Sequence, residues 1–234
     1  MTGCSRRDEL AVRLTAVRQR ISAACQAAGR DAADVTLIAV TKTRPASDVR
    51  LLSGLGVTDI GENRDAEAAP KAAQCADLPL TWHFIGQLQT NKCGSVVRYA
   101  TFVHSVDRMR LIRALGTAAR RAGRPIECLI EVSLDGDPAR GGALASDVPA
   151  LAEALAAEPG LVLAGVMAIA PLRMAPREAF ARLLESAAVV RAVRPAAAVV
   201  SAGMSGDLED AIAAGATHLR IGTALLGDRE PGVR

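Results

Sequence analysis

Short runs of apolar, β-branched residues alternate along the chain with longer segments in which apolar residues recur every three or four positions. The first run covers residues 35–41 (VTLIAVT), and similar runs lie near residues 57–61, 80–86, 101–106, 126–134, 161–170, 197–202 and 217–222. Runs of this kind are typical of strands buried on both faces, as in a parallel sheet. The pattern therefore predicts eight parallel strands.

The segments between these runs predict helices. Leu14, Val17 and Ile21 share one face of a helix that begins near Leu10, and Gly29 is placed to end it. Further helical patterns cover residues 109–122, 147–157 and 176–193. Eight strand and helix units in a row favour an α/β fold, a closed (β/α)8 TIM barrel preceded by an N-terminal helix.

The competing fold is an open doubly wound sheet, in which the first strand is commonly followed by a glycine-rich loop that binds phosphate. No such loop follows residues 35–41, and this weakens the alternative. No linker, low-complexity tract or second core interrupts the chain, and only a short segment follows the eighth run. We expect residues 1–234 to form a single domain.

Composition narrows the possible functions. Aromatic residues make up 2% of the chain, so stacking of nucleic-acid bases is not expected. The formal net charge is only +3, and the arginines are scattered, which is unlike a nucleic-acid-binding surface. Residues 1–14 contain no continuous apolar stretch, so they predict neither a secretory signal nor a membrane helix. We expect a cytoplasmic protein that binds neither nucleic acid nor membrane.

The five cysteines are an odd number without metal-ligand or redox spacing, as expected for free thiols in a reducing compartment. The three histidines do not cluster with cysteines or carboxylates at metal-ligand spacing, so no metal site is predicted. His83 and His104 fall in the third and fourth predicted strands and could face the mouth of the barrel. His218 begins the eighth strand and is expected to be structural.

Lysine is scarce, since the chain contains only Lys42, Lys71 and Lys92. Lys42 ends the first predicted strand, in AVTKTRP, and the reactive groups of a (β/α)8 barrel lie at the C-terminal ends of its strands. Burial of the Lys42 amine in the mouth would lower its pKa and favour Schiff-base chemistry. The alternative is that its side chain extends to solvent. Lys71 follows Pro70 in a polar helical segment and is expected to be solvated. Lys92 lies in the loop or helix after the third strand, and this position does not indicate whether its side chain is functional.

Two segments near the end of the chain could bind an anion, because barrels commonly hold phosphate in the loops after strands seven and eight. In SAGMSGDLED, Ser205 lies where the seventh strand gives way to a helix N-terminus. In HLRIGTALLG, Arg220 lies near the mouth, and Gly222 and Thr223 start the next helix. Taken alone, Ser205 is better read as an ordinary N-cap residue, followed by an acidic first turn.

Seven blocks, taken together, resemble the YggS/PROSC family of pyridoxal phosphate homeostasis proteins. They are AVTKTRP, GEN, WHFIGQLQTNK, VHSVD, GVMAI, SAGMSGDLEDAIAAG and HLRIGTALLG. Their order and spacing cover nearly the whole chain, and WHFIGQLQTNK is the most specific. The resemblance implies a barrel of the alanine racemase N-terminal domain type, which is fold type III among proteins that bind pyridoxal phosphate.

The resemblance also implies roles for individual residues. Pyridoxal 5'-phosphate would be held as a Schiff base on Lys42, and Arg220 would approach the pyridine nitrogen. The phosphate would be held by Ser205, Gly222 and Thr223, and the ring would lie beside Asn63 and His83. Two segments depart from the family pattern, RDAEA after GEN and ALLG in place of the commoner AIFG. These departures affect the rim of the mouth and leave the lysine and the phosphate groups intact.

The resemblance implies a non-catalytic protein that stores, delivers or regulates pyridoxal phosphate. We expect a monomer whose partners are the cofactor and the apo-enzymes that require it. The alternatives are a fold type III enzyme, such as an amino-acid racemase, and a Schiff-base aldolase. A two-base racemase needs a second acid or base opposite the lysine, and the only tyrosine, Tyr99, precedes the fourth strand, away from the mouth. A guanidinium beside the pyridine nitrogen would also weaken the ring as an electron sink.

Overall fold

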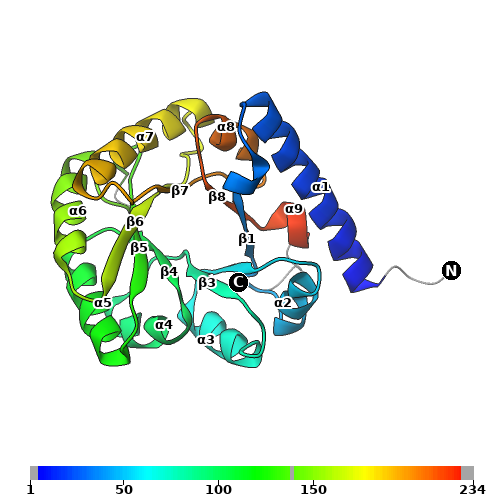
Figure 1. Ribbon diagram of the computed structural model, residues 1–234, viewed down its shortest axis with the longest axis horizontal. Helices are drawn as coiled ribbons and strands as arrows, with labels where there is room; N and C mark the ends of the chain where they lie inside the picture. Colours follow the sequence, from blue (N-terminus) through cyan, green and yellow to red (C-terminus); the bar gives the residue numbers. More distant parts are fainter. Residues whose placement is uncertain (1–4, 138–139, 228–234) are drawn as a thin grey trace.

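The computed structural model describes residues 5–137 and 140–227. Its strands are parallel and close a barrel in chain order, with the eighth strand paired to the first (Figure 1). The strands are β1 (Thr36–Val40), β2 (Asp59–Glu62), β3 (Thr81–Phe84), β4 (Phe102–Val106), β5 (Ile126–Glu131), β6 (Leu161–Met167), β7 (Val199–Ser201) and β8 (His218–Ile221). The predicted (β/α)8 barrel is confirmed, and each strand falls on its predicted run.

The helices form a ring outside the barrel (Figure 1). The α-helices are α1 (Arg6–Ala27), α2 (Ala46–Ser53), α3 (Asp65–Gln74), α4 (Cys93–Tyr99), α5 (Met109–Ala122), α6 (Val148–Ala157), α7 (Pro176–Val193), α8 (Leu208–Ala213) and α9 (Thr223–Leu226). Three single 3-10 turns, η1 (Ala32–Asp34), η2 (Thr90–Lys92) and η3 (Ala145–Asp147), precede β1, α4 and α6.

Helix α1 precedes the barrel units and has clear signals at both ends. Ser5 and Asp8 form a capping box, in which each side chain bonds to the other residue's backbone N–H. At the other end, Gly29 has a φ of +65°, the left-handed conformation that glycine adopts most readily after a helix. The buried face of the helix carries Leu14 and Val17 and packs on α8 and α9. The sequence pattern of this helix is therefore confirmed.

The core is built almost entirely from aliphatic side chains between the barrel and its helices. Phe84 and Phe180 are the only two aromatic residues among its largest fully buried side chains in the described part. Cys25, Cys75, Cys93 and Cys128 are buried free thiols, whereas Cys4 lies outside the described residues. Across residues 5–137 and 140–227, no helix has the length and apolar character needed to cross a membrane.

Candidate functional site

A cavity of about 530 Å³ opens at the C-terminal ends of the barrel strands. Its lining comes from residues on β1, β5 and β8 and from the loop that follows each strand except β4. Six of the seven residues predicted for the site line this cavity: Lys42, Asn63, Ser205, Arg220, Gly222 and Thr223. Segments from the beginning, middle and end of the chain therefore converge on one space.

Lys42 lies in a tight turn directly after β1. The Arg44 N–H donates to the carbonyl oxygen of Thr41 at 3.0 Å, so residues 41–44 form a β-turn with Lys42 at its second position. Thr43, at the third position, has a φ of +64°, whereas the φ of Lys42 is negative. This combination defines a type II turn, whose third position favours glycine or asparagine. A β-branched residue there costs on the order of 1–3 kcal/mol, and surrounding contacts must hold it.

Lys71 supplies one of those contacts, and the expectation that it is solvated was wrong. Its side chain is buried and forms an ion pair with Glu62. Its Nζ also donates to the Thr41 carbonyl oxygen at 2.9 Å, and the Thr41 hydroxyl donates to Glu62 Oε1 at 2.6 Å. Burial raises the pKa of Glu62, and the neighbouring ammonium group opposes that shift. Lys71 is close to the Lys42 turn in space but does not line the cavity.

Asn63 reaches the cavity at the end of β2, next to a glycine that allows a very close approach. A Cβ atom added to Gly86 would lie 2.1 Å from the carbonyl oxygen of Asn63, so only glycine fits there. Gly86 itself lines the cavity. The glycine in the block WHFIGQLQTNK therefore brings the loop after β3 against the loop after β2.

Ser205 and the first turn of α9 meet in the part of the mouth formed by the loops after β7 and β8, and β8 is paired with β1. The Ala224 N–H donates to Ser205 Oγ at 3.1 Å, so the hydroxyl bridges the loop after β7 to the turn that begins with Thr223. Ser205 does not cap its own helix, because the N-cap of α8 is Asp207. The alternative reading of Ser205 as an ordinary N-cap residue is therefore wrong.

Arg220 lies on β8 with its guanidinium group buried beneath the cavity. It donates to Ser201 Oγ at 2.7 Å and to the Ala168 carbonyl oxygen at 2.8 Å. Burial lowers the pKa of Arg220 to about 10, although Glu131 and Asp207 favour its charged form. The group remains a cation near neutral pH, which makes this end of the cavity positive.

His83 is the predicted site residue that does not line the cavity. It is 1% exposed within the barrel, where Nε2 lies 3.0 Å from Asp59 Oδ1 and Nδ1 lies 3.0 Å from His104 Nε2. Phe102 stacks on its ring. The barrel interior, not the mouth, surrounds both His83 and His104, so the expectation that these rings could face the mouth was wrong. His218 lies beside them, with its ring centroid 6.2 Å from that of His83.

These histidines belong to a hydrogen-bonded chain that reaches Arg220. His104 Nδ1 lies 3.0 Å from Ser201 Oγ, which also receives the hydrogen bond from Arg220. Arginine can only donate, so Ser201 Oγ is the acceptor of that bond, and its own hydrogen is then available for His104 Nδ1. His104 is then protonated on Nε2 and donates to His83 Nδ1, and His83 donates from Nε2 to Asp59. Burial, with the charges of neighbouring groups, lowers the pKa of His104 well below its ordinary value, consistent with a neutral ring.

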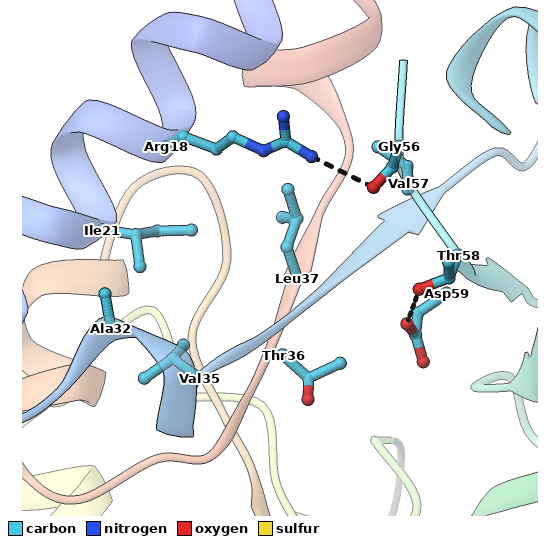
Figure 2. A pocket seen from close by; sticks show the side chains of 10 residues that line it. All are labelled: Arg18, Ile21, Ala32, Val35, Thr36, Leu37, Gly56, Val57, Thr58 and Asp59. Atoms are coloured by element: carbon cyan, nitrogen blue, oxygen red, sulfur yellow. Dashed lines mark hydrogen bonds between the residues drawn. The ribbon is translucent and has the colours of Figure 1, made fainter. Parts of the chain in front are cut away.

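Asp59, at the far end of this series of hydrogen bonds, lines a second cavity of about 360 Å³ at the N-terminal ends of β1 and β2. Figure 2 shows Asp59 bonded to the Thr58 hydroxyl and Arg18 bonded to the Gly56 carbonyl oxygen. Burial opposes ionisation of Asp59, but hydrogen bonds from His83 and Thr58 outweigh it, and the pKa of Asp59 falls below its ordinary value. None of the predicted site residues lines this second cavity.

Comparison with known proteins gives the chain its family. Residues 12–230 match the family described as alanine racemase, N-terminal domain. The chain is 43% identical over 226 residues to the pyridoxal phosphate homeostasis protein of Pseudomonas aeruginosa, across 95% of this chain and 97% of that protein. The chain belongs to the pyridoxal phosphate homeostasis protein family. The Mycobacterium tuberculosis member is 42% identical over 244 residues, across 96% of this chain and 94% of its own.

A solved structure of the same family has the same fold. PipY of Synechococcus elongatus, determined with pyridoxal phosphate bound, matches with a TM-score of 0.82 and 34% identity. The match covers 93% of this chain and 100% of PipY. The barrel described above is therefore the family's fold over nearly its whole length.

Sequence reasoning did not find every polar group that lines the cavity at the mouth. Glu131, Arg44, Gln87 and Arg140 also line it. Burial raises the pKa of Glu131 to about 7, with a smaller contribution from Asp107. Glu131 ends β5 with no motif around it, and the predicted strand ran on to residue 134. Only its position at a strand end could have identified it.

Proposed function

We propose that this protein binds pyridoxal 5'-phosphate in the cavity at the barrel mouth and functions in homeostasis of that cofactor, by storing, delivering or regulating it. The observation that carries the proposal is the convergence of Lys42, Arg220 and the Ser205–Thr223 side of the mouth on one cavity. The relatives named for this role and the PipY complex with pyridoxal phosphate support it.

The residues present fit the cofactor. A cavity of about 530 Å³ lies within the usual range for small-molecule sites, roughly 300–1,000 Å³. The bound cofactor would supply an aldehyde, and among the residues that the structure describes Lys42 is the only lysine that lines the cavity. We propose that Lys42 Nζ holds it as a Schiff base. Asn63, which lines the same cavity from the loop after β2, would lie beside the ring.

The part of the mouth formed by the loops after β7 and β8 is suited to a phosphate group. Because Ser205 Oγ accepts a hydrogen bond from Ala224, its own hydrogen can be donated to a phosphate oxygen. Thr223 and Gly222 line the same cavity, and they would offer a hydroxyl and backbone N–H groups to the phosphate. Arg220 would place a permanent positive charge near the ring nitrogen, which disfavours protonation of that nitrogen and so disfavours carbanion chemistry. We therefore propose a non-catalytic role, with apo-enzymes as the recipients of the cofactor.

One observation favours an amino-acid racemase as a second candidate. Glu131 lines the cavity with a pKa of about 7, which is suited to proton transfer near neutral pH. Against this candidate, Tyr99 ends α4 and lies outside the cavity, with its hydroxyl 3.4 Å from Asp65 Oδ1 of α3. A chiral assay over the common amino acids decides between the two, because turnover on the order of 10 per second would establish an enzyme.

Borohydride reduction followed by peptide mass mapping tests the cofactor assignment. The protein loaded with pyridoxal phosphate should be yellow, and reduction should place the pyridoxyl group on Lys42. Lys71 is an internal control, because its ammonium group is held in a buried ion pair. Label confined to Lys71 or Lys92 would refute the assignment.

A further inference from the structure

The turn that carries Lys42 is held from one side by helix α3. The two residues that flank Lys42 each bond to a charged side chain of that helix or of the strand before it. Thr41 bonds through its carbonyl oxygen to Lys71 and through its hydroxyl to Glu62. The Thr43 N–H donates to Glu67 Oε2 at 3.0 Å. Because Glu67 and Lys71 are four residues apart, they lie on one face of α3, directed at the turn.

The backbone of this turn requires such support. Thr43 occupies the left-handed conformation at the position of a type II turn where glycine is favoured, and a β-branched side chain disfavours that conformation. The hydrogen bond to Glu67 ties down the N–H of the strained residue itself. A rotation of the Thr41–Lys42 peptide or of the next one would redirect the Lys42 side chain, which starts from the second position of the turn.

We propose that Glu67 and Lys71 are positioning residues, which hold the turn of residues 41–44 so that Lys42 is directed into the cavity for its covalent linkage to pyridoxal phosphate. The proposal rests on the proposed function and adds two residues that do not line the cavity. Glu67 acts on Thr43 through a hydrogen bond to a charged acceptor, and Lys71 acts on Thr41 together with Glu62. Lys71 therefore bonds to the residue before Lys42 in the sequence, and Glu67 bonds to the residue after it.

Glu67 gives the sharper test, because the chain offers matched controls. Glu67→Ala removes the acceptor for Thr43, whereas Glu67→Gln keeps an oxygen in its place. Glu67 also lies 4.0 Å from Arg64 in an exposed ion pair. Arg64→Ala removes that ion pair and leaves the bond to Thr43, so it separates the two interactions.

Two ligands separate the covalent contribution from the rest of the site. Pyridoxal phosphate can link to Lys42, whereas 4-deoxypyridoxine 5'-phosphate lacks the aldehyde and can use only the non-covalent contacts. We expect Glu67→Ala to weaken pyridoxal phosphate by about tenfold, as for loss of one hydrogen bond to a charged group. The analogue should change by less than about twofold, and Glu67→Gln and Arg64→Ala should resemble the wild type. Equal losses for both ligands, or a loss reproduced by Arg64→Ala, would overturn the proposal.

A measurement on the ligand-free protein provides a second readout. Hydrogen exchange of the Thr43 amide should be about tenfold or more faster in Glu67→Ala, at an unchanged melting temperature. Unchanged exchange would show that Glu67 does not hold the turn. If the wild type binds both ligands equally, the covalent link of the proposed function is refuted, while the exchange result still reports on the turn.

Lys71 is tested by a double substitution, because removal of Lys71 alone would leave a buried carboxylate without its partner. Glu62→Gln combined with Lys71→Met removes both charges and keeps an acceptor for the Thr41 hydroxyl. We expect a folded protein that binds the analogue normally and pyridoxal phosphate more weakly by about three- to tenfold. Normal affinity for both ligands would remove Lys71 from the proposal. A loss for both would mean that the ion pair serves the fold.

Discussion

Polar side chains in the loops and turns at the mouth of the barrel have a different use from those on the strands inside it. At the mouth, Lys42 and Thr223 face a cavity of about 530 Å³. In the interior, His83 and His104 are 1% and 0% exposed and bond to each other. Groups that face a cavity retain hydrogen-bonding capacity for a ligand, whereas groups that satisfy one another contribute to the fold. Substitutions at the mouth should therefore affect affinity, and substitutions in the interior should affect stability.

The largest effect should come from Lys42→Ala. The change removes the amine that we propose for the covalent linkage, so affinity for pyridoxal phosphate should fall by about a hundredfold or more. The free energy of unfolding should change by less than about 1 kcal/mol, because the side chain is partly exposed at the mouth. Equilibrium titration and urea unfolding measure the two quantities. A large loss of stability with retained affinity would contradict the comparison.

The interior should show the opposite pattern. Asp59→Ala leaves the His83 N–H without its acceptor, and an unsatisfied buried donor costs about 1–3 kcal/mol of unfolding free energy. Asp59 is remote from the cavity at the mouth, so the affinity of the protein for pyridoxal phosphate at a temperature where it is folded should stay within about twofold. Urea unfolding and titration of the same preparation test both halves of this expectation. A loss of affinity comparable to that of Lys42→Ala would show that the barrel interior also determines cofactor binding.

An intermediate effect is expected on the phosphate side of the mouth. The double change Ser205→Ala and Thr223→Ala removes two hydroxyl donors, and affinity for pyridoxal phosphate should fall by roughly tenfold or more. Unphosphorylated pyridoxal should bind weakly to both proteins and change little. Equal losses for the two ligands would mean that these residues support the fold. Unchanged affinity for pyridoxal phosphate would place the phosphate elsewhere.

The smallest effect should be on the pH dependence of stability, which should have opposite slopes for Glu131 at the mouth and His218 in the interior. Burial raises the pKa of Glu131 to about 7 in the folded protein, above its unfolded value. Its contribution to stability is present below the unfolded pKa and is lost as the pH rises through 7, by about 1 kcal/mol between pH 6 and 8. Urea unfolding of Glu131→Gln should lack this decline. An identical decline in the variant would assign it to other groups.

His218 provides the contrasting slope in the interior. Burial lowers its pKa to about 4, below the unfolded value near 6.5. The unfolded chain therefore binds more protons in this window, and stability should fall as the pH drops from about 6.5 towards 4. Glu131 at the mouth thus lowers the stability of the protein at high pH, and His218 in the interior lowers it at low pH. His218→Gln should flatten the acidic part of the profile measured by urea unfolding, and an unchanged acidic slope would contradict this assignment.

The spacing of apolar residues predicted the barrel well, because the buried positions of a strand or helix repeat within a few residues. The predicted helices at residues 109–122 and 176–193 coincide with α5 and α7. Lys42 and Ser205 could be placed near the mouth because the strand ends of a barrel share one face. His83 and Lys71 could not be placed, because their surroundings depend on distant segments. Asp59 and Glu62 contact them only after the barrel closes, and no local pattern indicates either contact.

The chain of hydrogen bonds inside the barrel also limits how protons reach the cavity. With the Ser201 hydrogen on His104, each hydrogen in it points from Arg220 towards Asp59, and a guanidinium group has no lone pair with which to accept. A proton that entered at Asp59 could pass along the two imidazole rings to Ser201 only if every bond reversed, and it would then meet a cation that cannot take it. This series of hydrogen bonds therefore does not conduct protons to the cavity. The open mouth gives a group bound beside Lys42 a different route for proton exchange, through solvent and Glu131.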